Sequence, residues 1–422
     1  CFKLHKLKPA VVWRLPSLTQ LPIRGRILRE LRDHFGVAAP KLRVFRSSVD
    51  EGGESDIAAL LQPCLSNATN ESAEWGWLTL AEMMQHKLLP SMESFHLPER
   101  VSVDVAHAVP SCWPALRHLC LYLPAREQVL DLLASMPALE SFEAASDEKK
   151  LAAADGASAD NRVIVMKRLA RLTLCGGAVA VGRRLLLPAL LELELNGASL
   201  ASTESIDLTP WLQAAPALQQ LDVFATTIDV DAPSALRPHA CLRHLRLNAD
   251  AESRAVSNLA AATPDLTSLH FACMRNATML AIVKTLHRWR GLAELSLRGG
   301  APASVPWVPV AAIAIEALPR LQAFTFPEPN HTGKSTLLAS TFAARCRRGA
   351  NDSAMRTPTL LLFGIGCAAA WNCREPEWAA LDTPSSSSVA ATLASFEAAV
   401  AADAADHKSY DSPSAFVFLR KA

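Results

Sequence analysis

The chain has 422 residues, half of them apolar, and its 42 Lys and Arg residues almost balance its 41 Asp and Glu residues. This balance gives no reason to expect nucleic acid or an anionic membrane surface as a partner. The longest apolar run, residues 359–371, is shorter than the roughly 20 residues that a membrane-spanning helix needs. We therefore expect no membrane span.

The ten cysteines are scattered along the chain, and none belongs to a C-x-x-C pair or to a spacing typical of zinc ligands. Single cysteines in an apolar chain are typical of proteins in a reducing compartment. We therefore expect an intracellular, cytoplasmic protein with no metal and no cofactor. Five Asn-x-Ser/Thr patterns point the other way, because they fit the acceptor sequence for glycosylation. They begin at Asn67, Asn70, Asn276, Asn330 and Asn351.

One six-residue phrase recurs along the chain, with apolar residues at its first and fourth positions and, in most copies, at its sixth. A weak copy is expected near Leu65, where Asn67 and Asn70 interrupt the pattern. From Leu190 onward, successive copies begin 24 to 29 residues apart. The clear copies begin at Leu18, Leu42, Met92, Leu116, Leu139, Leu169, Leu190, Leu218, Leu242, Leu266, Leu292 and Leu321.

The phrase predicts a strand, because side chains two positions apart point to the same side of a strand and the fourth and sixth positions would face inward together. An all-helical repeat is the alternative, since a three-residue Leu spacing also fits a helix. A Pro or Gly precedes most copies and favours the strand, because either residue ends a helix there. Helices are expected between the phrases, over residues 27–35 (ended by Gly36), 56–61, 78–87 and 129–136, and polar excursions up to residue 74 and over 145–161.

The L-x-x-L-x-L phrase resembles the leucine-rich repeat. That resemblance implies an α/β solenoid, with a curved parallel β-sheet on the concave side and helices on the convex side. No copy carries Asn or Cys at the ninth position, where many such families have a ladder residue. The array is therefore irregular, and it is most similar to the divergent repeats of F-box-type adaptor proteins. We expect a solenoid over residues 1–327 and a C-terminal cap or tail over 328–422, with a flexible linker near 383–388.

The resemblance also implies a function: a non-enzymatic scaffold that binds a protein partner on the concave face. A substrate receptor of a ubiquitin ligase is one form of this role. No F-box is recognisable in residues 1–40, so that module would have to lie upstream of Cys1.

The candidate contact residues are the outward strand positions of the phrases. Two of them, Tyr122 and Phe224, are expected to be exposed aromatic anchors. An acidic band of Glu192, Glu194 and Asp222 beside a basic one favours a partner of mixed charge, and ordinary polar surface filling is the alternative. The full set is His118, Tyr122, Arg171, Glu192, Glu194, Asn196, Gln220, Asp222, Phe224, His244, Arg246, Asn248, His270, Glu294 and Arg298.

A nucleotide-binding protein is the alternative from another class. Residues 328–336 resemble the phosphate-binding loop G-x-x-x-x-G-K-[ST], in which Lys334 would meet the phosphates and Ser335 the magnesium ion. Glu328 replaces the first glycine, however, and no apolar strand ending in Asp follows. With no H-E-x-x-H or G-x-S-x-G motif present either, we expect no enzymatic activity.

Overall fold

The computed structural model describes residues 11–15, 17–24, 35–39, 41–48, 54–61, 79–85, 89–146, 163–197, 205–231, 238–273, 276–299 and 317–325. The chain divides into two compact units, Cys1–Ala249 and Asp250–Ala422. The expected tail, the linker near 383–388 and the glycine-rich loop at 328–336 lie outside the described residues.

In the first unit, short strands alternate with helices. The strands are β1 (Val11–Arg14), β2 (Gln20–Arg24), β3 (Phe35–Ala38), β4 (Val44–Ser48), β5 (Ser94–Arg100), β6 (His118–Leu123), β7 (Ser141–Ser146), β8 (Ile164–Val165), β9 (Arg171–Gly176), β10 (Leu185–Leu186), β11 (Glu192–Asn196), β12 (Ser205–Asp207) and β13 (Gln220–Asp229). The helices are α2 (Glu54–Leu61), α3 (Leu80–Gln85), α4 (Val103–Cys112), α5 (Arg126–Ser135), the 3₁₀ helix η3 (Gly177–Arg184) and α6 (Thr209–Ala214).

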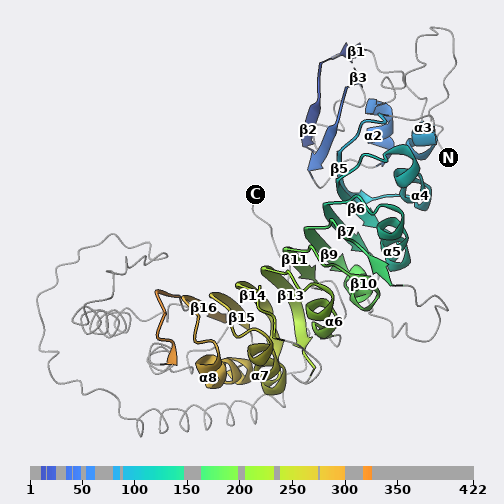
Figure 1. Ribbon diagram of the computed structural model, residues 1–422. Helices are drawn as coiled ribbons and strands as arrows, with labels where there is room; N and C mark the ends of the chain where they lie inside the picture. The colour runs from blue at the N-terminus through green and yellow to red at the C-terminus, as the bar shows by residue number, and fades with distance from the viewer. Residues whose placement is uncertain are drawn as a thin grey trace, which may run out of the picture. The chain divides into compact units, whose positions relative to one another are not determined.

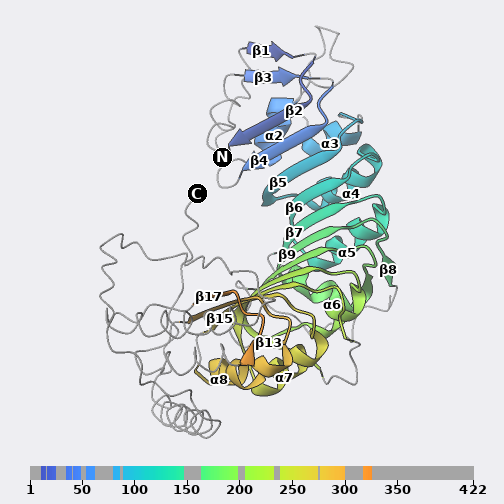
Figure 2. The same cartoon turned by 60° about the vertical axis from the view of Figure 1, so that its left-hand side comes forward.

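The main sheet of this unit is a parallel ladder in chain order. Its strands follow the order β2, β4, β5, β6, β7, β9, β11 and β13, with the short β12 added on β13. Two smaller parallel pairs join β1 to β3 and β8 to β10. Helices α4, α5 and α6 lie on one side of the ladder, as Figure 1 shows. Figure 2 shows β5, β6, β7 and β9 stacked in sequence. This is the architecture of a leucine-rich-repeat solenoid.

A tight turn sets the start of almost every phrase. The first residue of the phrase donates its N–H to a carbonyl three residues earlier, as in Leu139 to Met136 (3.2 Å) and Leu218 to Ala215 (3.1 Å). Pro137 and Pro216 each occupy the second position of such a turn, where the fixed φ of proline fits. The prolines thus end the preceding helix and also shape the turn that starts the next strand.

The first, fourth and sixth phrase positions form the core, as the sequence predicts. In the copy at Leu190, for example, Leu190, Leu193 and Leu195 are all at most 1% exposed. Their register partners are equally buried: Leu193 pairs with Leu172 on one side and Leu221 on the other. Burying a leucine is worth about 1.5–3 kcal/mol, so this stack is the main source of stability.

Alternating charges run along the second phrase position of four successive strands. Arg43 forms an ion pair with Glu93, and Arg117 pairs with Glu140 at 3.0 Å. Backbone hydrogen bonds connect the same residues in order, from Glu93 to Arg43, Arg117 to Glu93 and Glu140 to Arg117. Exposed pairs contribute at most about 1 kcal/mol each. These exposed pairs therefore add little to the stability of the fold.

The second unit repeats the same plan. Its elements are α7 (Ser253–Ala262), β15 (Ser268–Cys273), α8 (Asn276–Thr285), the 3₁₀ helix η5 (Leu286–Arg288), β16 (Glu294–Gly299) and β17 (Ala323–Thr325). Strand β14 (His244–Ala251) spans the boundary between the units, and β15, β16 and β17 pair in parallel.

Buried hydroxyl groups connect the elements of the second unit. The Thr278 hydroxyl, within one of the glycosylation patterns, is buried and donates to the Ala251 carbonyl at 3.0 Å. The Trp289 indole donates to the Thr263 hydroxyl at 3.1 Å.

One expectation for the N-terminal region was wrong. The helix over 27–35 was expected to end at Gly36, but Phe35 and Gly36 lie in β3, which pairs with β1 in parallel. A partner strand thus overrides the helical spacing at Phe35. Leu65, where a weak copy is expected, and the polar excursion up to residue 74 lie outside the described residues.

The core predicts a large penalty for truncating Phe95. This side chain is fully buried, and its ring centroid lies 5.6 Å from that of Phe45 and 4.6 Å from that of Trp113. We expect Phe95→Ala to lower the free energy of unfolding by about 3–5 kcal/mol, measured by urea denaturation of the full chain. His118→Ala, at an exposed position of the next strand, should change it by less than about 0.5 kcal/mol. Equal effects of the two substitutions would contradict this core.

Candidate functional site

The face of the first unit away from the helices carries the predicted contact residues in three rows. Strand register aligns the same phrase position in neighbouring strands, so each row crosses the ladder. The first row contains Ser94, His118, Ser141, Arg171, Glu192 and Gln220. The second contains Arg46, His96, Cys120, Glu143, Thr173, Glu194 and Asp222. The third contains Tyr122, Ala145, Cys175, Asn196 and Phe224.

The first row is the most exposed of the three. His118, Arg171, Glu192 and Gln220 are all exposed. Arg171 and Glu192 are register partners and form an ion pair at 3.0 Å, with side chains 67% and 48% exposed. Solvent screens a pair this open, so both groups keep much of their charge available to a partner.

The second row holds two carboxylates side by side. Glu194 and Asp222 are register partners on β11 and β13, and both are half-buried. The Gln220 amide donates to Asp222 at 3.3 Å. Adjacent strands lie about 4.8 Å apart, so the two acidic residues belong to one small area of this face.

The two aromatic residues are less exposed than the sequence predicts. Tyr122 and Phe224 are both half-buried. The Arg246 guanidinium lies over the Phe224 ring, 5.3 Å from its centroid. This cation–π contact covers part of the ring and holds the guanidinium in place.

The remaining predicted residues fall into the two units separately. In the first, His244 and Arg246 are exposed and Asn196 and Asn248 half-buried. In the second, His270 and Glu294 are exposed, and Glu294 accepts a hydrogen bond from the Ser268 hydroxyl at 2.9 Å. Arg298 pairs in register with Ala272, and its side chain lies outside the described residues. The acidic band and its basic neighbours therefore all belong to the first unit.

Three potential metal ligands, not predicted from the sequence, meet in the second row. One ligand atom each of His96, Cys120 and Glu143 lies within 4.8 Å of the others. Burial lowers the pKa of His96, against the opposing effect of Glu143. Burial also raises the pKa of the Cys120 thiol, and the charge of Glu143 and a hydrogen bond to it raise that pKa further. All three occupy the fifth position of successive phrases. Their proximity can be recognised in the sequence only when the phrases are aligned and their fifth positions are compared.

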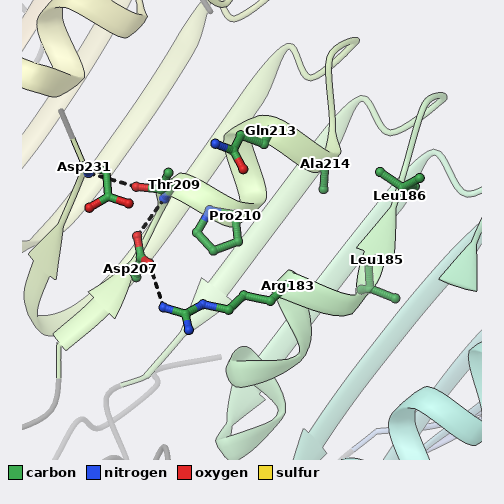
Figure 3. Close-up of a pocket in the computed structure, with 10 residues that line it drawn as sticks. Arg183, Leu185, Leu186, Asp207, Thr209, Pro210, Gln213, Ala214 and Asp231 are labelled. Atoms are coloured by element: carbon green, nitrogen blue, oxygen red, sulfur yellow. Dashed lines mark hydrogen bonds and ion pairs between the residues drawn. The ribbon is translucent and has the colours of Figure 1, made fainter. Parts of the chain in front are cut away.

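A cleft of about 350 Å³ lies on the other side of the ladder, between η3 and α6, and is drawn in Figure 3. Arg183 pairs with Asp207 across it at 3.4 Å, and Asp207 also accepts the Thr209 N–H at 2.9 Å. At its wall, a Cβ added to Gly182 would lie 2.5 Å from the Trp211 ring. Two charged groups of this cleft, Arg183 and Asp207, thus partly neutralise each other.

No protein-family model and no curated protein matches the chain. Among solved structures, an internalin from Listeria monocytogenes aligns over 74% of this chain and 83% of its own, with 14% identity and a TM-score of 0.33. A likeness this distant carries no functional argument. The assignment as a leucine-rich-repeat solenoid rests on the strand ladder and its buried phrase positions.

Within the described ranges, no helix has the length and apolar character needed to cross a membrane. Four cysteines with described side chains form no disulfide and differ in exposure: Cys112 and Cys120 are buried, Cys175 is intermediate and Cys241 is exposed.

The environment of Cys120 predicts slow alkylation. At pH 8 and without metal, the raised pKa keeps the thiol protonated, and only 6% of the residue is exposed, so little reactive thiolate reaches solvent. We expect iodoacetamide to modify exposed Cys241 first and Cys120 only after unfolding in urea. Timed alkylation and peptide mass spectrometry measure this, because the tryptic peptide His118–Arg126 contains one cysteine. Equal rates at the two sites in the folded chain would refute the prediction.

Proposed function

We propose that this chain is a non-enzymatic scaffold that binds a protein partner on the sheet face of its first unit. The observation that supports this most is the half-buried pair Glu194 and Asp222 near the Arg246–Phe224 stack. Aromatic and Arg residues are enriched at protein interfaces, and the acidic pair adds charge complementarity for a basic group. Both stand on strands whose positions the core fixes.

The chemistry of this face selects the kind of partner. The paired carboxylates of Glu194 and Asp222 suit a Lys or Arg side chain, which would form charge-assisted hydrogen bonds there. Arg246, exposed above Phe224, suits an acidic or aromatic group. A partner with adjacent basic and acidic groups therefore fits best, and such complementarity acts mainly on the rate and specificity of association.

The finer proposal is an intracellular adaptor, and in particular the substrate-receptor arm of a ubiquitin ligase. Its support is the similarity of the irregular repeats to those of F-box-type proteins. Ubiquitin-ligase subunits should then co-purify with the full-length protein, together with a substrate whose capture depends on the sheet face. Substrate capture with no ligase subunit would contradict the receptor role and indicate a scaffold of another kind.

Charge reversal on the sheet face is the direct test. We expect the double variant E194K/D222K to bind its partner at least about tenfold more weakly, which corresponds to about 1.4 kcal/mol. The fold should persist, because a pair of positive charges replaces a pair of negative charges at the same two positions. The matched control is D131K/D231K, which changes the net charge equally at exposed positions on α5 and beside the cleft.

The measurement is affinity capture with the full chain as bait, followed by titration of each captured protein against the three purified chains. Partners that bind all three equally would contradict the proposal. So would partners lost from the control as readily as from E194K/D222K, because the loss would then reflect net charge and not the sheet face.

A further inference from the structure

Residues His96, Cys120 and Glu143 form a compact group on three adjacent strands. They are register partners on β5, β6 and β7, and one ligand atom from each lies within 4.8 Å of the others. The ladder holds their backbones in place on both sides, so the spacing depends on strand pairing and not on a loop. This degree of preorganisation is what a binding site needs.

The three side chains offer nitrogen, sulfur and oxygen, and this donor set discriminates among metals. Calcium and magnesium prefer oxygen ligands alone. Zinc accepts His nitrogen, Cys thiolate and carboxylate oxygen in a tetrahedral site, and sites with three protein ligands leave the fourth position open. The geometry points to a zinc-binding site made by His96, Cys120 and Glu143, with its fourth position facing away from the helices.

The three ligands differ in burial, and this difference indicates the side from which an ion can enter. Cys120 is buried, His96 is intermediate and Glu143 is exposed, so an ion could enter from the Glu143 side. On binding, the Cys120 thiol loses its proton to solvent and the sulfur donates its electron pair to the metal. Arg46, the register partner of His96 on β4, adds an opposing positive charge. Its side chain is exposed, so solvent screens much of that opposition.

This site does not depend on the proposed partner binding. The strands β11, β13 and β14, which carry Glu194, Asp222, Phe224 and Arg246, contribute none of its ligands. A metal held here would be bound by the isolated chain, and the experiment therefore needs no partner.

The test uses the full chain after removal of metal with a chelator, titrated with Co²⁺ alone. We expect one Co²⁺ per chain with an intense near-ultraviolet band from thiolate-to-cobalt charge transfer, and displacement of that band by Zn²⁺. Cys120→Ala should abolish the band. The matched control Cys241→Ala, at an exposed cysteine of the same unit, should leave it unchanged.

Glu143→Gln provides a second variant that cannot disturb the core, because Glu143 is exposed. It should weaken Co²⁺ binding at least about tenfold, since even residues that only support metal ligands have effects of this size. The absence of the band at micromolar Co²⁺ would overturn the inference. So would a band that survives in Cys120→Ala, or binding that Glu143→Gln leaves unchanged.

Discussion

No single repeat of this chain can bury its own inner face. The leucines at the first, fourth and sixth phrase positions reach near-zero exposure only because a neighbouring strand carries the same positions at the same height. Each repeat therefore depends on the next, as in other quasi-one-dimensional proteins. The shared interior fixes the register of the strands, and a shift of one residue would turn every buried leucine outward.

The same constraint organises the opposite face. Once the inward positions are aligned, the outward ones must align too, so residues a full repeat apart become immediate neighbours. This brings Glu194 beside Asp222 and gathers His96, Cys120 and Glu143 into one group. The alternating ion pairs from Arg43 to Glu140 follow from the same register. Functional groups that are far apart in the sequence are thus neighbours on the sheet.

The sequence predicts the ladder well, because the apolar residues that identify each strand in the sequence are also the residues whose burial stabilises the fold. The burial pattern of the Leu190 copy, for example, follows directly from its apolar positions. One failure has a physical cause: Phe35 has a helical spacing that pairing with β1 overrides.

The candidate site was predictable in position but not in detail. The outward positions follow from the phrase, and the exposure of His118, Arg171 and Glu192 agrees with it. The half-burial of Phe224 under Arg246 depends on side-chain contacts that no repeat pattern specifies. The His96–Cys120–Glu143 group was not predicted from the sequence, because metal-site motifs are recognised by short spacing along the chain. These three ligands are each a full repeat apart.

Nuclear Overhauser contacts between leucine methyl groups test the shared interior most directly. In protein labelled at Leu and Val methyls, the Leu193 methyls should show contacts to both Leu172 and Leu221, its register partners. Contacts confined to residues three and four positions away along the chain would mean a helix at the phrase, and the stacked ladder would be wrong.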